Sequence, residues 1–127
     1  MDLLLDTHVA LWWAQEPGQL SGDVVRLVGA PLNEVWVSAA SAWELALKVR
    51  SGRLAVDVDR LFESLIGHGL RILGIGVDDA ITAGLLDWDH RDPFDRMLVA
   101  QAQRLALTIV TRDAAILSHP GVISTAA

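Results

Sequence analysis

The chain has 127 residues, of which 52% are hydrophobic and 20% charged, a balance typical of one globular domain over 1–127 that excludes a disordered chain. No apolar run approaches the ~20 residues of a membrane span, and no basic segment of the signal-peptide type opens the sequence. The absence of cysteine excludes disulfides and thiolate metal sites and favours a cytoplasmic location. A formal charge of −6 argues against a simple nucleic-acid-binding module, but not against an enzyme whose carboxylates bind a metal ion.

Short apolar runs alternate with helical periodicities along the first half of the chain. Leu3–Leu5 is typical of a buried strand, and this run ends at Asp6. The elements that follow are a helix broken at Pro17-Gly18, a helix capped by Ser21 and ended by Gly29, a strand at 35–37, and a helix that starts at Ser38 or Ser41 and closes at Gly52. In this last helix the spacing predicts an inward face of Ala39, Ala42, Trp43, Ala46 and Leu47.

The second half continues the alternation. It predicts a helix introduced by Asp57, a strand at 70–75 interrupted by Gly74, a helix with apolar residues from Val77 to Trp88, a helix that begins at Pro93, a strand at 107–110, a short helix at 114–117 and a terminal strand at 122–123. Because the strands are solid apolar runs separated by helices, they belong in a parallel sheet covered on both faces. The expected fold is α/β, with a central, mostly parallel sheet of four to five short strands flanked by helices.

The stretch Asp92–Ala102 combines a clear helix start with two carboxylates. Asp is a favoured N-cap and Pro is tolerated at the first helical position, so Asp92 is the predicted N-cap, Pro93 the first helical residue and Asp95 the third. Both acids then suit the free N–H groups and the positive end of the helix dipole. The alternative is that a carboxylate in this first turn points toward a metal ion. Taken alone, the stretch favours the first interpretation.

Three further acids stand where a parallel sheet would bring them together. Asp6 directly follows a strand, Asp113 follows the strand at 107–110 by two residues, and Glu44 lies about two turns into the helix after 35–37. Functional sites lie beyond the carboxyl ends of parallel strands, so Asp6 and Asp113 are expected at one edge, with Asp95 and Glu44 within reach. Carboxylates ~4 Å apart repel by about 1 kcal/mol in water and about 4 in a protein, which favours a bound cation. Oxygen ligands without cysteine or patterned histidine favour Mg²⁺ or Mn²⁺.

Each of these acids also has a purely structural interpretation. Asp6 and Asp113 suit the N-caps of the helices that follow them, and Glu44 forms a favourable i, i+4 pair with Lys48, worth ~0.2–0.5 kcal/mol. Basic residues near the end of the same helix suit its dipole better than an RNA-backbone contact: Lys48, Arg50 and Arg53. The histidines in predicted loops have no ligand spacing and are expected to be polar surface residues: His68, His90 and His119.

Four blocks of the chain resemble the acidic blocks of PIN domains, and within that family the VapC-type toxins of bacterial toxin–antitoxin pairs. The blocks are Leu3–His8, Ser38–Glu44, Asp92–Ala102 and Leu107–Asp113. The resemblance covers nearly the full length, with the blocks in order and at the expected spacing. The third block is specific, the first two are weak signals taken singly, and the set of four is strong.

The resemblance implies a PIN-like three-layer fold and a Mg²⁺- or Mn²⁺-dependent endoribonuclease that hydrolyses RNA phosphodiester bonds. It also implies inhibition by a cognate VapB-type antitoxin, and a homodimer that enters a larger toxin–antitoxin complex. The positions that match principal metal ligands are Asp6 and Asp95, those that match the remaining acids are Asp113 and Glu44, and those that match supporting hydroxyls are Thr7 and Thr111. Asp92 is ambiguous, because its context favours a cap although it would lie close to the metal.

Two other classes compete with this interpretation. A receiver domain has a similar length and an acid at the end of its first strand, but it needs an acceptor Asp after its middle strand and a Lys late in the chain. Here the strand at 70–75 is followed by Gly76-Val77-Asp78, and the sole lysine is Lys48. The other alternative is a non-catalytic PIN-like interaction module, which loss of RNA cleavage on replacing Asp6 or Asp95 would distinguish from an enzyme.

Overall fold

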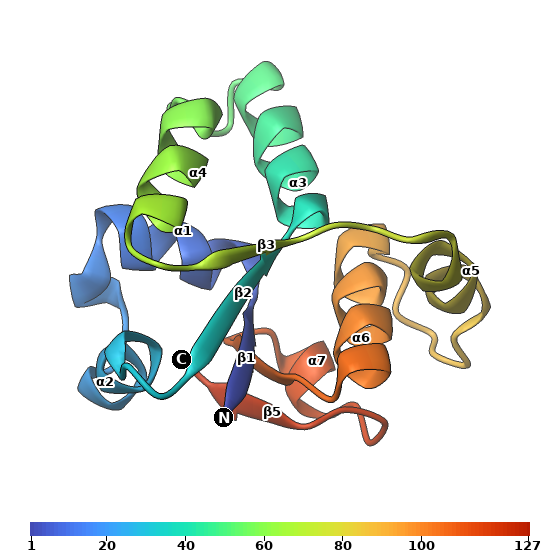
Figure 1. The fold of residues 1–127 in the computed structure, drawn as a ribbon. Helices are drawn as coiled ribbons and strands as arrows, with labels where there is room; N and C mark the ends of the chain where they lie inside the picture. The colour runs from blue at the N-terminus through green and yellow to red at the C-terminus, as the bar shows by residue number, and fades with distance from the viewer.

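The computed structural model describes residues 1–127 and contains a central sheet surrounded by helices (Figure 1). The strands are β1 (Asp2–Leu5), β2 (Glu34–Ser38), β3 (Arg71–Leu73), β4 (Thr108–Thr111) and β5 (Ser124–Ala126). The helices are α1 (Thr7–Gln15), the 3₁₀ helix η1 (Pro17–Gln19), α2 (Gly22–Gly29), α3 (Ala39–Arg50), α4 (Val58–Gly67), α5 (Val77–Leu85), α6 (Pro93–Leu105) and α7 (Ala114–Leu117). None of these helices combines the length and the apolar character that a membrane span requires.

All neighbouring strands are parallel, in the order β3-β2-β1-β4-β5. The chain starts in the centre at β1, builds outward through β2 and β3, and then returns to the other side of β1 to add β4 and β5. The strand order therefore reverses between β1 and β4. In open α/β sheets a crevice forms at this switch point, beyond the carboxyl ends of the strands. The residues that follow β1 and β4 flank that crevice.

Successive side chains of each strand enter two separate cores, because they point to opposite faces of the sheet. Leu3 and Leu5 of β1 pack with residues of α1, α2 and α4, whereas Leu4 packs with Leu98 of α6 and Ile116 of α7. Figure 1 shows the first group of helices on one side of the sheet and the second group on the other. The expectation of a parallel sheet covered on both faces is confirmed, and burial on both sides explains why the strands are solid apolar runs.

Most predicted helix starts are confirmed by capping hydrogen bonds, and the errors in strand position lie at the edges of the sheet. The side chains of Ser21, Ser38 and Asp57 each accept a hydrogen bond from a backbone N–H in the first turn of the following helix. The third strand is shorter than the predicted 70–75, and the last strand lies beyond the predicted 122–123. β5 pairs with β4 through backbone groups and carries small, mainly polar residues, so hydrophobicity alone misplaces it.

The predicted inward face of α3 is wrong. Trp43 has 58% of its surface exposed and Leu47 is also exposed, whereas the buried residues of this helix are Ala40, Ser41 and Leu45. The helix contacts α1, α4 and α6. Small residues at this face let the neighbouring helices approach closely, and a helical periodicity of bulky residues does not detect such a face.

The apolar face of α5 is also directed outward. Val77, Ile81 and Leu85 are each more than half exposed, while Asp79 and Ala83 are the buried residues of the helix. On the buried side of α5, Arg104 of α6 donates to both carboxylate oxygens of Asp79. This pair holds the polar side of α5 against α6 and leaves the apolar stripe free.

Candidate metal centre

Asp6 leaves the end of β1 as a buried carboxylate, with 7% of its surface exposed. It stands at the N-cap position of α1, but its side chain accepts no capping hydrogen bond. Instead the Thr111 hydroxyl donates to Asp6 Oδ2 at 2.6 Å, and the same hydroxyl accepts from the backbone N–H of Asp113 at 2.9 Å. Thr111 therefore ties the end of β1 to the end of β4. Burial raises the pKa of Asp6 above its usual value, against the lowering effect of the Thr111 hydrogen bond.

The start of α6 separates the roles of its two aspartates as capping rules predict. Asp92 accepts from the backbone N–H groups of Phe94 and Asp95, at 2.9 and 3.1 Å. The carboxylate of Asp95 takes no part in this cap and is buried. Burial raises the pKa of Asp95 to about 7, and the negative charges of Asp92, Asp6 and Asp113 act in the same direction.

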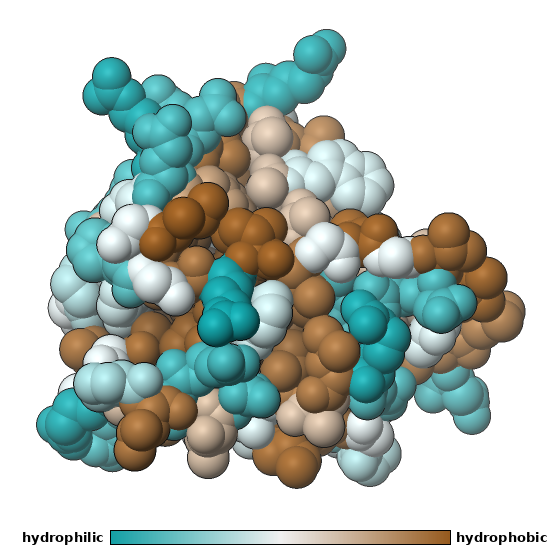
Figure 2. Space-filling model, in the orientation of Figure 1, coloured by the Kyte–Doolittle hydropathy of each residue, from teal (hydrophilic) through white to brown (hydrophobic).

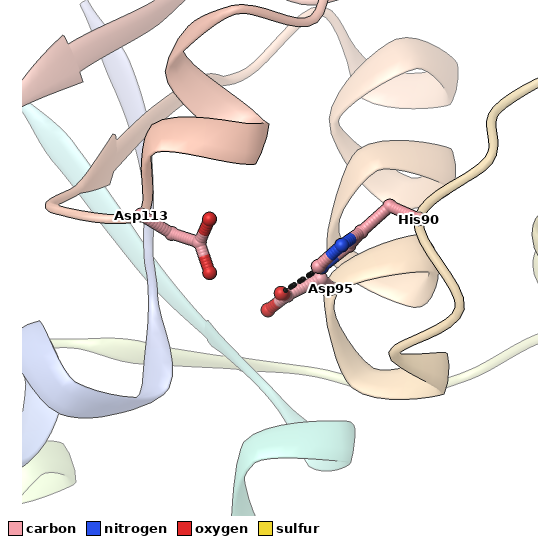
Figure 3. Close-up of side chains that lie close together, drawn as sticks. All are labelled: His90, Asp95 and Asp113. Carbon is pink, nitrogen blue, oxygen red and sulfur yellow. Dashed lines mark hydrogen bonds and ion pairs between the residues drawn. The ribbon is translucent and has the colours of Figure 1, made fainter.

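Asp113 caps a helix and also lies beside Asp95. Its side chain accepts from the backbone N–H of Ala115 at 2.8 Å and so caps α7. Figure 3 shows the same carboxylate facing that of Asp95 across an open space. Asp113, Asp95 and His90 each offer a ligand atom, and these atoms lie within 4.8 Å of one another.

Glu44 likewise combines a surface pair with a place near the site. Its carboxylate lies 3.3 Å from Lys48 Nζ, one turn further along α3, which confirms the predicted pair. The side chain is nevertheless mostly buried. Glu44 approaches the crevice from α3, whereas the other three acids approach from the ends of β1 and β4 and the start of α6.

All four predicted acids line one cavity of about 660 Å³, together with Asp92. The same cavity is lined by basic or ionisable nitrogen-bearing side chains: His8, Lys48, Arg53 and Arg112. The guanidinium of Arg112 lies over the ring of Trp12, 4.7 Å from its centroid. The cavity is thus lined by both acidic and basic side chains.

The hydroxyl of Thr7 does not contact the acids. It donates to the hydroxyl of Ser41 at 2.8 Å, and both groups are buried. The bond joins the first turn of α1 to α3, so Thr7 helps to fix the elements that carry Asp6 and Glu44. Its backbone N–H, in contrast, favours the charged form of Asp6.

His90 is a residue whose place the sequence pattern does not reveal, and the expectation of a polar surface residue is wrong for it. Its ring is half-buried, and Nε2 lies 2.7 Å from Asp95 Oδ2. The two residues are separated by the helix start at Pro93, so neither helical nor strand spacing relates them. The available signal is proximity in sequence to a candidate ligand, combined with a turn that folds the chain back.

The donor set fits a hard divalent cation. Asp6 and Asp95 are both buried with raised pKa values, which indicates that the folded protein disfavours their charged forms. The nearby Lys48 lies against Glu44 and His8, so it does not neutralise these two carboxylates directly. A divalent cation would relieve the repulsion, and carboxylate oxygens are the ligands that Mg²⁺ and Mn²⁺ prefer.

Comparison with known proteins agrees with this architecture. The chain is 36% identical over 120 residues to Ribonuclease VapC22 of Mycobacterium tuberculosis, a match that covers 92% of this chain and 91% of that protein. Among solved structures, VapBC2 from Rickettsia felis bound to a promoter DNA fragment matches with a TM-score of 0.71 and 16% identity, over 99% of this chain and 98% of that one. DNA-bound VapBC from Salmonella typhimurium also matches with a TM-score of 0.71, at 18% identity and the same coverage.

These solved structures share the α/β fold of this chain, which is built around a parallel sheet. The family model of the PIN domain matches residues 3–121, which includes all four acidic blocks and replaces the receiver interpretation. The chain belongs to the PIN domain family.

Proposed function

We propose that this protein is a metal-dependent endoribonuclease and the toxin of a VapBC-type toxin–antitoxin pair. The observation that carries the proposal is the convergence of Asp6, Glu44, Asp95 and Asp113 on one cavity of a PIN domain. The relative named Ribonuclease VapC22 supports RNA as the substrate. The VapBC assemblies among the structural matches support a VapB-type antitoxin as the partner, in the cytoplasm where both would meet RNA.

In this proposal Asp6 and Asp95 are the principal ligands of Mg²⁺ or Mn²⁺, and Asp113 and Glu44 bind the ion directly or through water. A bound ion of this kind lowers the pKa of a water molecule and neutralises charge on the scissile phosphodiester. The protein's own contribution is to hold the carboxylates in place before the substrate arrives. Thr111 orients Asp6, and the cap formed by Asp92 sets the helix turn that carries Asp95.

The basic residues of the cavity explain how a protein of net charge −6 would accept RNA. We assign Lys48, Arg53 and Arg112 to the phosphates on either side of the scissile bond, because they line the same cavity as the acids. Backbone phosphates are the groups that Arg and Lys contact in sequence-independent binding. The helix-dipole interpretation of Lys48 and Arg53 does not conflict with this assignment.

A homodimer is the expected assembly of the toxin. Val77, Ile81 and Leu85 form an exposed stripe on α5, and Trp43 of α3 is exposed as well. An apolar cavity of about 260 Å³ is lined by Trp43 and by residues of α5 and α6. Figure 2 shows hydrophobic surface at the edge of the molecule where α5 lies. An exposed apolar patch of this kind is typical of a protein–protein interface, and a second copy of the chain is its proposed occupant.

The decisive test compares RNA cleavage by the wild type with that by Asp6→Asn and Asp95→Asn, in Mg²⁺, in Mn²⁺ and in EDTA. Each substitution removes a ligand charge at nearly constant shape, so we expect cleavage to fall by more than about 100-fold, beyond the loss typical of a supporting partner. Asp59→Asn, an exposed acid in the first turn of α4, is the matched control. Equal cleavage by the wild type and both variants would contradict the proposal. If the wild type cleaves no RNA, the result would favour the non-catalytic interaction module.

A further inference from the structure

His90 lies in the segment between α5 and α6, directly before the helix start that carries Asp95. Its Nε2 atom is 2.7 Å from Asp95 Oδ2, the distance of a strong hydrogen bond. Figure 3 shows the imidazole lying along the Asp95 carboxylate, which in turn faces Asp113. A carboxylate that binds a metal accepts hydrogen bonds and donates none, so Nε2 carries the hydrogen in the metal-bound protein.

Arg96, the neighbour of Asp95 on α6, fixes the backbone of His90. Its Nη1 donates to the carbonyl oxygens of His90 and Trp88, at 3.0 and 2.7 Å. Its remaining nitrogens donate to carbonyls at the end of α5 and just after it, including those of Ala83 and Leu86 at 2.8 Å each. One guanidinium thus satisfies the C-terminal carbonyls of α5 and anchors the segment that carries His90 to the helix that carries Asp95.

Aromatic contacts fix the plane of the His90 ring. The ring of Trp88 lies 4.8 Å from that of His90, centroid to centroid, at an angle of 40°. Trp88 also makes an edge-to-face contact with His119, and the two ring centroids are 4.7 Å apart. His119 accepts a hydrogen bond from the backbone N–H of Gly121, which holds it in the turn after α7. His90 is therefore restrained at its backbone, its ring face and its Nε2 atom.

We propose that His90 is a positioning residue for the metal centre, which holds Asp95 by Oδ2 so that Oδ1 is directed to the metal ion. The proposal rests on the proposed function and names a residue of the same site. A ligand carboxylate without such a partner has more freedom to rotate about its terminal bond, and it loses that freedom when it binds the ion. Outer partners of this kind orient metal ligands and raise their affinity, typically 10- to 100-fold.

The test measures Mn²⁺ affinity in the RNA-free protein by electron paramagnetic resonance titration. We expect His90→Ala to weaken Mn²⁺ binding by about 10-fold, and His90→Gln to restore part of the loss because the Gln amide also donates a hydrogen bond. His68→Ala is the control, because His68 contacts Trp13 and lies outside the cavity. Melting temperatures identify any variant that fails to fold. Equal affinities of the wild type and a folded His90→Ala variant would overturn the proposal.

A second measurement separates positioning from direct ligation. Nitrogen coupling to bound Mn²⁺ reports an imidazole in the coordination shell, and we expect none that depends on His90. A coupling present in the wild type and lost in His90→Gln would make His90 a ligand and overturn the positioning role. A wild-type protein that binds no Mn²⁺ would overturn the proposed function as well, whereas equal affinities would overturn the role of His90 alone.

Discussion

Asp79 and Asp95 occupy the same position in two neighbouring helices and have opposite electrostatic surroundings. Each is the third residue of its helix, in α5 and α6 respectively, and each is buried, with 1% and 7% of its surface exposed. Asp79 accepts from Arg104 and from the backbone N–H of Gly76, and the hydrogen bond from Arg104 holds its pKa below the usual value. Asp95 contacts His90 and faces other carboxylates, and burial raises its pKa to about 7.

The hydrogen-bond partners at the two helix starts differ. The carboxylate of Asp79 turns back to accept from the backbone N–H of Gly76, the N-cap residue of α5. At the start of α6 the side chain of Asp92 accepts from the N–H groups of Phe94 and Asp95, and the carboxylate of Asp95 lies 2.7 Å from His90 Nε2. The third residue of a helix can therefore either complete a capping box or direct its carboxylate to a functional site. The protein tolerates an unfavourable buried charge at Asp95 and neutralises the one at Asp79.

The pH dependence of stability in EDTA is the most direct test of the difference between Asp79 and Asp95. The unfolded chain releases the proton of Asp95 near pH 3.9, whereas the folded protein releases it near pH 7. Between these values the folded state binds the extra proton, so the free energy of unfolding contributed by this group falls as the pH rises. Asp95→Asn stays neutral throughout. We expect it to match the wild type near pH 4 and to exceed its stability by up to about 4 kcal/mol at pH 8.

Urea unfolding of both proteins across this pH range provides the measurement. Groups distant from the site titrate alike in the two proteins, so the difference between them reports Asp95 together with the carboxylates that interact with it. Asp59→Asn serves again as the control, and its difference from the wild type should not grow with pH. A difference for Asp95→Asn that stays constant from pH 4 to pH 8 would show that Asp95 titrates as an ordinary surface acid.

Replacement of Asp79 should lower the free energy of unfolding, whereas Asp95→Asn should raise it. Asp79→Ala leaves Arg104 without its partner and the N–H of Gly76 without an acceptor, so we expect a loss of about 2–3 kcal/mol at neutral pH. The loss stays below that of a fully buried pair because the Arg104 side chain is 43% exposed and can turn to water. The contribution of Asp79 is present above its unfolded pKa and is lost as the pH falls. Urea unfolding measures it, with Asp59→Ala, an exposed acid in the first turn of α4, as the control.

The features that the sequence predicts correctly are those set by local physics. Capping chemistry places the start of α6 at Pro93 and assigns the cap to Asp92. Apolar runs place β1, β2 and β4, and the ends of neighbouring parallel strands bring Asp6 and Asp113 to one crevice. Only their sequence positions and the parallel arrangement are needed for that step.

The features that the sequence does not predict depend on contacts between distant elements. The orientation of α5 follows from the pair of Asp79 with Arg104, which are 25 residues apart. The position of His90 follows from the fork of Arg96, which meets the carbonyls of a segment with no regular structure. Periodicity describes one element at a time, so it misses a helix that packs through its polar side and a loop whose backbone is bound by the guanidinium of the next helix.

The smallest effect we expect concerns Thr111, whose hydroxyl partly offsets the burial of Asp6 as Arg104 offsets that of Asp79. A neutral hydroxyl stabilises a carboxylate less than a guanidinium does, so Thr111→Val should lower the free energy of unfolding by only about 1 kcal/mol. Because the loss leaves Asp6 less well oriented, we also expect Mn²⁺ affinity to fall by about 10-fold. Thr108→Val, at the start of the same strand, controls for the change of residue type. If both variants bind Mn²⁺ as the wild type does, Asp6 owes its orientation to the backbone at the end of β1 and needs no side-chain partner, which would separate it from both Asp79 and Asp95.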